Sequence, residues 1–187
     1  LLITSPPYGD NISTITYGQH SYLPLQWIDL DDIDPQVAAG SYLRTTQEID
    51  RRSLGGRSNI NGLNQSIKYL CDQSPFLQNV FAALESHPID RSARVAAFYG
   101  DIIITLDNLL PSVKPGGFMV WTLGNRKVGG KEIPTDKIFT DLLMSRQSEF
   151  VCEISREIRN KRMPHKNNFS TTMKYEKILI FQKRGGE

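Results

Sequence analysis

The sequence opens on Leu1-Leu2-Ile3-Thr4-Ser5-Pro6-Pro7-Tyr8, an apolar run that leads directly into Ser-Pro-Pro-Tyr. Leu1 to Thr4 predict a buried strand, and Pro6 ends it because proline has no N–H to continue a ladder. Pro7 holds Pro6 in an extended conformation as well. The pattern therefore predicts a stiff loop at the carboxyl end of a strand, where open α/β sheets bind their ligands. An amine lying flat on Tyr8 would find two acceptors there, the Ser5 hydroxyl and the Pro6 carbonyl.

Thr4-Ser5-Pro6-Pro7-Tyr8 resembles the catalytic motif of the S-adenosylmethionine-dependent DNA amino-methyltransferases, which methylate N4 of cytosine or N6 of adenine. In that family the loop holds a base flipped out of the duplex, and its Ser form is more usual for N4-cytosine. The resemblance implies that Ser5, Pro6, Pro7 and Tyr8 are catalytic and that Thr4 and Ser5 lie beside the cofactor. A Pro-Pro-Tyr sequence alone is also typical of a polyproline turn or ligand.

Length and composition are those of one ordinary globular domain, with 187 residues, 39% hydrophobic and 22% charged. No apolar run is long enough to span a bilayer and no signal-peptide pattern is present, so we expect a cytoplasmic protein without membrane contact. Cys71 and Cys152 are isolated, which favours buried structural thiols. The histidines have no metal-ligand spacing, and we expect no metal site.

Charge is uneven along the chain. Arg156 to Glu187 hold nine Lys or Arg against three Asp or Glu, a net charge of +6, whereas the remainder holds 13 against 17, or −4. Such asymmetry suits a surface that meets phosphate, and it is equally typical of a solvated tail.

Residues 11–90 are polar and rich in turns, and we interpret them as an insertion that is a candidate DNA-contacting region. Asp34-Pro35 and Ser74-Pro75 each predict a helix start, with a capping side chain followed by proline at the first helical position. Between these starts, Arg52, Arg57 and Asn59 are candidates for contacts to phosphates or bases. A long solvated loop is the alternative there.

From Ala96 onward the pattern is regular α/β. A predicted helix with Phe98, Ile102 and Leu106 on one face comes first, and a strand from Phe118 to Thr122 follows it. Next come a helix capped by Thr135 and a strand in which Phe150, Cys152 and Ile154 alternate. The final predicted strand runs from Tyr175 to Phe181. Arg126 and Lys127 follow the second of these elements as loop charges that either face DNA or are solvated.

This order is similar to the second half of a Rossmann-like methyltransferase sheet, from its fourth strand onward, with a largely helical or loop insertion. The resemblance implies that residues 1–187 form a single catalytic half-domain. The sequence holds no glycine-rich strand-to-helix loop for the cofactor and no acidic residue for its ribose. We therefore expect a missing amino-terminal half or a second polypeptide that carries this loop and pairs with the edge of Leu1 to Thr4. Alone, the chain should bind S-adenosylmethionine weakly or not at all.

Arg159 to Phe169 stand between the last two predicted strands and are similar to the loop that supplies an aromatic ring against the flipped base in this family. The resemblance implies that Phe169 is the other wall of the base pocket and that Lys161, Arg162 and Lys166 contact phosphates of double-stranded DNA. The alternative for Phe169 is an ordinary core aromatic under a basic hairpin.

These observations together predict a site-specific DNA methyltransferase of a restriction-modification system that uses S-adenosylmethionine, with N4 of cytosine the favoured target. N6 of adenine is the first alternative. The protein-glutamine methyltransferases use an Asn-Pro-Pro-Tyr loop, and Ser5 and the basic terminal region argue against them. A non-catalytic DNA-binding subunit on the same fold is the alternative from another class.

Overall fold

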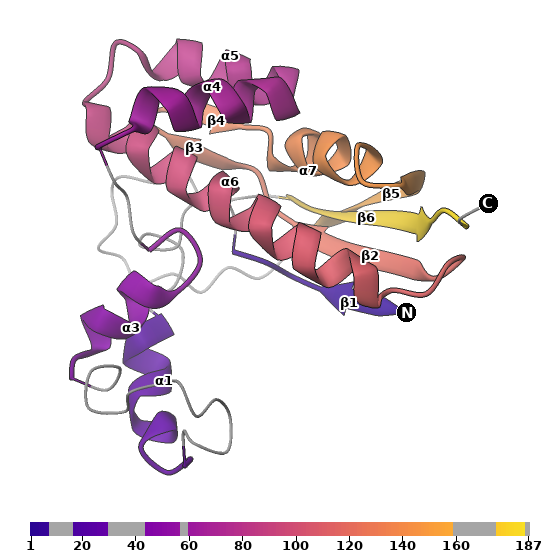
Figure 1. Ribbon diagram of the computed structural model, residues 1–187, viewed down its shortest axis with the longest axis horizontal. Helices are drawn as coiled ribbons and strands as arrows, with labels where there is room; N and C mark the ends of the chain where they lie inside the picture. Colours follow the sequence, from indigo (N-terminus) through magenta and orange to yellow (C-terminus); the bar gives the residue numbers. More distant parts are fainter. Residues whose placement is uncertain (8–16, 30–43, 57–59, 159–174, 186–187) are drawn as a thin grey trace.

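A four-stranded mixed sheet, in the order β1-β2-β6-β5, runs through the larger part of the molecule (Figure 1). The computed structural model describes residues 1–7, 17–29, 44–56, 60–158 and 175–185. Strand β1 (Leu2–Thr4) pairs in parallel with β2 (Phe118–Leu123). Strand β6 (Tyr175–Lys183) lies between β2 and β5 (Ser148–Glu157) and is antiparallel to both.

Helices cover one face of this sheet (Figure 1). They are α4 (Leu63–Gln73), α5 (Pro75–Leu84), α6 (Ile89–Leu109), which ends in a short 3-10 turn η2 (Leu110–Ser112), and α7 (Thr135–Met144). One core joins them to the strands and includes, among others, Leu70, Leu77, Phe81, Phe98, Ile102, Leu106, Met119, Trp121, Phe139, Leu179 and Phe181. The part of the polar 11–90 region from Leu63 onward thus packs into the same core as the sheet.

The helix start predicted at Ser74-Pro75 is confirmed. The Ser74 hydroxyl accepts a hydrogen bond from the Phe76 amide at 3.2 Å, and Pro75 is the first helical residue. Ser74 is fully buried, and its hydroxyl also donates to Asp141 Oδ2 at 2.5 Å, which ties α5 to α7. The helix predicted around Phe98 is present but begins earlier, at Ile89.

The predicted cap at Thr135 is wrong. Thr135 is the first residue of α7 and makes no side-chain cap. It is fully buried, and its hydroxyl lies 3.4 Å from the Tyr99 hydroxyl, which donates to it. The capping acceptor comes instead from Asn125, whose Oδ1 accepts from the Asp136 amide at 3.2 Å.

The predicted alternation of Phe150, Cys152 and Ile154 is also wrong. A register shift between Phe150 and Cys152 makes Val151 an extra residue, so that Phe150 pairs with Phe181 whereas Cys152 pairs with Ile180. Phe150 packs edge-on against Phe181 on the helix-covered face, with ring centroids 5.4 Å apart. Cys152 and Ile154 therefore face the other side of the sheet.

Strand β1 is only partly buried, which corrects the prediction of a buried strand. Leu2 packs against the core, but Ile3 is 68% exposed and Leu1 is 85% exposed. β1 is an edge strand, and no element among the described residues covers the face on which Ile3 lies.

Strands β3 (Arg126–Val128) and β4 (Lys131–Ile133) form a separate hairpin. Its two-residue turn is Gly129-Gly130, and both glycines have positive φ, 60° and 79°, as a type I′ turn requires. Arg126 and Lys127, predicted in a loop, therefore lie on a strand. The hairpin is anchored by Ile133, which is fully buried.

Two short helices, α1 (Tyr17–Leu25) and α3 (Thr46–Arg52), pack on each other and stand apart from the sheet (Figure 1). The Gly18 amide donates to Asp50 Oδ1 at 2.7 Å. A Cβ atom at Gly18 would lie 1.9 Å from the Thr46 carbonyl oxygen, so the helices approach this closely only because residue 18 is glycine. We call α1 and α3 the helical lobe. The helix start predicted at Asp34-Pro35 lies outside the described residues.

Candidate functional site

The Ser-Pro-Pro loop leaves the sheet at the carboxyl ends of two parallel strands. Thr4, the last residue of β1, is level with Trp121 of β2, so Ser5, Pro6 and Pro7 emerge beside the end of β2. Ser5 is exposed, whereas Thr4, Pro6 and Pro7 are half-buried. This edge of a parallel pair is where α/β sheets place ligands, and we call it the carboxyl edge.

Asn125 organises the neighbouring part of the carboxyl edge. It follows the end of β2, and its Oδ1 accepts from the Asp136 amide of α7 while its Nδ2 donates to Glu132 Oε1 at 3.3 Å. One side chain therefore fixes the end of β2 to a helix N-terminus and to the β3–β4 hairpin. The backbone after β2 is held in place next to the Ser-Pro-Pro loop.

The start of α7, which Asn125 contacts, carries polar groups that are buried. Asp136 is 4% exposed, and its Oδ1 has no hydrogen-bond partner within the part of the chain that the structure describes. Tyr99 is fully buried, and burial raises the pKa of its hydroxyl far above the ordinary value. The phenol therefore stays neutral and acts as the hydrogen-bond donor to Thr135.

On the side of β2 away from β1, β5 ends and β6 begins at the same edge of the sheet as the carboxyl ends of β1 and β2. Lys177 donates to Glu153 and, at 3.0 Å, to Ser155 Oγ, and the hydrogen bond to Glu153 raises the pKa of Lys177. Arg156 pairs with Glu176 across the two strands. These charges neutralise one another, so they hold the strand ends together rather than present a single sign of charge.

The structure brings together Thr4, Ser5, Pro6 and Pro7 of the predicted site. Arg52 lies elsewhere, at the end of α3, where its Nε is 2.9 Å from Glu48 Oε1. The remaining predicted residues fall outside the described ranges, and these are Tyr8, Arg57, Asn59, Lys161, Arg162, Lys166 and Phe169.

Asn125 and Asp136 are the residues that sequence reasoning missed. The available signal was an amide directly after an apolar strand, at Gly124-Asn125, followed by an acidic residue in the first turn of the next helix. Their pairing spans eleven positions of sequence and depends on the intervening hairpin, so no local pattern reveals it.

The described residues do not form a cofactor cradle of the glycine-rich type. Their positive-φ glycines lie at helix ends, before β2, or in the hairpin turn, and none joins a strand to a following helix; they are Gly55, Gly62, Gly116, Gly129 and Gly130. In the same ranges no group of three or more His, Cys, Asp or Glu is placed to hold a metal ion.

Within the described ranges, every helix is too short or too polar to cross a membrane.

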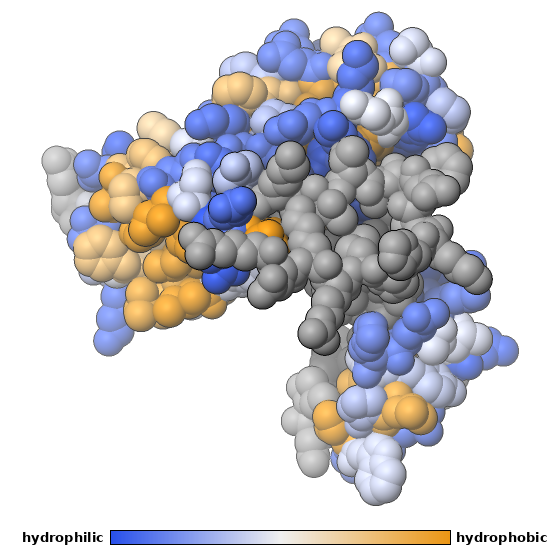
Figure 2. Space-filling model, turned by 180° about the vertical axis from the view of Figure 1, so that it is seen from behind, coloured by the Kyte–Doolittle hydropathy of each residue, from blue (hydrophilic) through white to orange (hydrophobic). Residues whose placement is uncertain are grey.

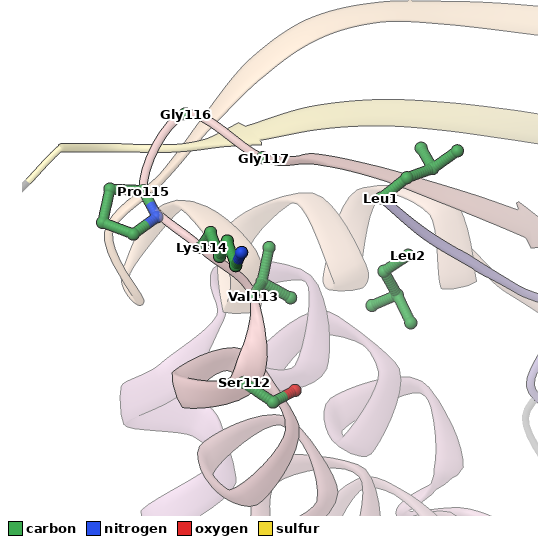
Figure 3. Close-up of a pocket in the computed structure, with 8 residues that line it drawn as sticks. All are labelled: Leu1, Leu2, Ser112, Val113, Lys114, Pro115, Gly116 and Gly117. Carbon is green, nitrogen blue, oxygen red and sulfur yellow. The ribbon is translucent and has the colours of Figure 1, made fainter.

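A hollow of about 450 Å³ opens at the opposite end of the sheet (Figure 3). Leu1, Leu2 and residues 112–117 line it, so it lies where β1 and β2 begin. Its polar side chains are those of Ser112 and Lys114. Sheets with parallel strands bind their ligands at the carboxyl ends of the strands, whereas this hollow lies at their amino ends. We therefore place the candidate site at the carboxyl edge and not in this hollow.

The comparison with known proteins adds one relative. The chain is 34% identical over 190 residues to the Type II methyltransferase M.MvaI of Kocuria varians. The match covers 97% of this chain but 40% of that protein, so the chain spans well under half of the relative's length. No family model matches the chain, and no solved structure matches it significantly.

Proposed function

We propose, from its similarity to a Type II methyltransferase, that this chain is the catalytic part of a DNA amino-methyltransferase of a restriction-modification system. The observation that carries the proposal is the position of Ser5-Pro6-Pro7 at the carboxyl edge of the parallel pair β1–β2. The strand order, with an antiparallel β6 between β2 and β5, supports a Rossmann-like methyltransferase sheet from its fourth strand onward.

In the proposed reaction the chain's own groups position and activate an exocyclic amine. The lone pair of such an amine is delocalised into the base, so acceptors for both amino protons make the nitrogen more nucleophilic. Ser5 Oγ and the Pro6 carbonyl are the proposed acceptors, and Tyr8 is proposed to stack on the base, which is worth about 1–3 kcal/mol. Positioning supplies most of the rate, and no strong base is needed before transfer.

S-adenosylmethionine is the proposed methyl donor, and it supplies an electrophilic methyl group. Thr4 and Ser5 are the proposed contacts from this chain. Because the described residues offer no glycine-rich cradle, we assign the main cofactor loop to protein outside these 187 residues. Calorimetry should then detect cofactor binding to the complete enzyme and little or none to the chain alone.

Double-stranded DNA is the proposed substrate, with the target base flipped out of the helix. The proposed phosphate contacts are Arg52 of the helical lobe, Arg57, and the basic residues Lys161, Arg162 and Lys166. Phe169 is the proposed second wall of the base pocket. This assignment predicts that DNA affinity falls with increasing salt concentration.

Mass spectrometry of nucleosides tests the proposal. DNA treated with the complete enzyme and S-adenosylmethionine should contain N4-methylcytosine, the target that the Ser5 form favours. N6-methyladenine in its place would support the alternative specificity. The absence of both, in an enzyme preparation that binds DNA, would reject methylation of an amino group.

The rival function is a DNA-binding subunit without catalysis. Tyr8→Ala separates the two, because a catalytic clamp loses turnover far more than duplex affinity. Tyr8→Phe is the matched control, since it keeps the ring that stacks on the base. Equal losses of turnover and affinity in Tyr8→Ala would favour the binding subunit.

A further inference from the structure

The helical lobe is held together by its own hydrogen bonds and projects from the body of the molecule, at the lower right of Figure 2. Asp50 of α3 accepts the Gly18 amide of α1 through Oδ1 at 2.7 Å. The carbonyl of Asp50 accepts the Ser53 hydroxyl at 2.6 Å, which closes the end of α3. The two helices are therefore joined to each other, and we expect the lobe to move as one body.

The chain leaves the lobe along the surface of α6. Leu54 packs against the core, and the Gly55 amide donates to Asp101 Oδ2 at 2.7 Å. Gly55 has a φ of 72°, and a Cβ atom there would lie 3.1 Å from the Cα and Cβ atoms of Phe98. Only glycine therefore lets this backbone lie so close to α6. We call Leu54, Gly55 and Asp101 the lobe anchor.

The turn of α6 that receives the lobe anchor, residues 98–101, also reaches the candidate site. Tyr99 is fully buried in this turn and donates to Thr135, the first residue of α7. The next residue of α7, Asp136, donates its amide to Asn125 at the carboxyl edge. One helical turn thus fixes both the lobe and the end of β2, so the distance between them depends on the lobe anchor.

The lobe is also the continuation of the Ser-Pro-Pro loop along the chain. Pro7 and Tyr17, the first residue of α1, are ten positions apart in the sequence. The lobe lies beyond the end of the sheet toward which β1 runs (Figure 1). In the proposed function Arg52 of this lobe contacts a phosphate, so the orientation of the lobe sets where DNA lies relative to the loop.

We propose that Asp101 is a positioning residue for methyl transfer and acts through Gly55. By accepting the Gly55 amide it holds the helical lobe in one orientation, and DNA on the lobe then presents its target base to Ser5-Pro6-Pro7. The inference rests on the proposed function, because it takes the lobe as a DNA contact. A misplacement of about 1 Å can cost about 100-fold in rate, so one hydrogen bond at the base of the lobe is sufficient to affect turnover.

Three substitutions in the complete protein test the role of Asp101. Asp101→Ala removes the acceptor, whereas Asp101→Asn keeps one, since an amide oxygen also accepts an N–H. Asp107→Ala is the matched control, because Asp107 lies on the same helix and pairs with Arg146 near the end of α7 instead of with the lobe. Both alanine variants gain the same helix propensity.

Single-turnover methylation of saturating duplex should be about 10-fold slower in Asp101→Ala, with a smaller loss of duplex affinity. Asp101→Asn should restore the rate, and Asp107→Ala should leave it unchanged. A merely structural role would instead lower Tm and the active fraction without changing the rate of the folded enzyme. Equal rates in the two alanine variants, or no rescue by asparagine, would overturn the proposal.

Distances between two spin labels report the orientation of the lobe directly. Spin-labelled amino acids replace Gln47, exposed on α3, and Met144, 50% exposed on α7. The distribution of distances should be broader in Asp101→Ala than in the unsubstituted protein and should stay narrow in Asp101→Asn. An unchanged distribution in Asp101→Ala would reject the lobe anchor. A broad distribution with a normal methylation rate would reject the positioning role.

A pair of glycine substitutions tests the same contact from the side of the lobe. Gly55→Ala and Gly62→Ala introduce similar backbone strain, since their φ angles are 72° and 78°, but a Cβ atom at Gly62 meets nothing within 4 Å. Gly55→Ala should therefore slow methylation and broaden the distances, whereas Gly62→Ala should do neither. Equal effects would overturn the proposal. Absence of methylation by the unsubstituted enzyme would reject the proposed function alone, because the distances test the lobe anchor without it.

Discussion

Asn125 accepts, through its side-chain oxygen, the hydrogen bond of the Asp136 amide at 3.2 Å, and so joins the end of β2 to the beginning of α7. A helix N-terminus has unpaired amides that need such acceptors. Here the acceptor comes from another element, and it lies at the carboxyl edge beside the Ser-Pro-Pro loop. One side chain therefore caps α7 and fixes the backbone that follows β2 at the carboxyl edge.

Asn125→Ala should lower the free energy of unfolding by about 1 kcal/mol, the usual loss on removing a capping side chain. Asn108→Ala is the control, because the Asn108 side chain is exposed and its Nδ2 donates to the Ile104 carbonyl of the same helix. The control should cost less than about 0.5 kcal/mol. Urea unfolding measures both values, and equal losses would contradict the bridging role of Asn125.

Ser5→Ala should lower the methylation turnover of the complete enzyme by about 100-fold, as removal of one polar group that acts in the transition state commonly does. Duplex affinity should change by less than about threefold, because the hydroxyl is proposed to contact the amine and not the phosphates. Ser112→Ala, at the other end of the sheet, should alter neither value. Single-turnover kinetics and fluorescence anisotropy measure them, and a normal turnover in Ser5→Ala would remove Ser5 from the proposed mechanism.

Gly18→Ala should separate α1 from α3, because the new Cβ would lie 1.9 Å from the Thr46 carbonyl oxygen. If the helical lobe contacts DNA, duplex affinity falls while the unfolding of the sheet is unchanged. Gly100→Ala in α6 is the matched control, since its Cβ would meet nothing within 4 Å. That control should be neutral or stabilising by up to about 1 kcal/mol. Hydrogen exchange of the α1 amides reports the separation, and unaltered exchange in Gly18→Ala would disprove the close packing.

Stability should fall at alkaline pH through Tyr99. Its pKa is raised by burial in the folded state, so the unfolded chain loses this proton first, above about pH 10. The contribution of this group is therefore full below that pH and is lost as pH rises, by about 1.4 kcal/mol per pH unit for one proton. Tyr99→Phe should make the alkaline decline less steep. Urea unfolding between pH 8 and pH 11 measures the two profiles, and parallel profiles would contradict a neutral buried phenol.

Sequence reasoning succeeded where structure is decided locally. The start of α5 follows from Ser74 and Pro75 alone, and strand β2 from its apolar run between Gly117 and Gly124. It failed where a residue distant in sequence determines the local structure. Thr135 has the right chemistry for a cap, but burial against Tyr99 engages its hydroxyl, and Asn125 provides the acceptor. The extra residue Val151 leaves no local signature, because Phe150, Cys152 and Ile154 alternate equally well with or without it.

The candidate site shows the same division. Ser5-Pro6-Pro7 and their place at the end of a strand follow from the missing amide of proline and the preceding apolar run. Asn125 and Asp136, at the neighbouring end of β2 and the start of α7, come from later elements, and their pairing spans the hairpin between them. Tyr8, Phe169 and the basic residues around Lys161 remain predictions, since they lie outside the described residues.

The place of β6 in the sheet sets the order in which this protein can be assembled as it is synthesised. β6 is the last described strand, yet it separates β2 from β5 and is hydrogen-bonded to both. Until the ribosome has released residues 175–183, β5 lacks its one partner among the described strands, and β2 has only β1 beside it within that sheet. The nascent chain therefore carries the apolar strand β2 without its β6 partner while residues 124–183 are synthesised, and a chaperone that binds extended apolar segments would meet β2 in this interval.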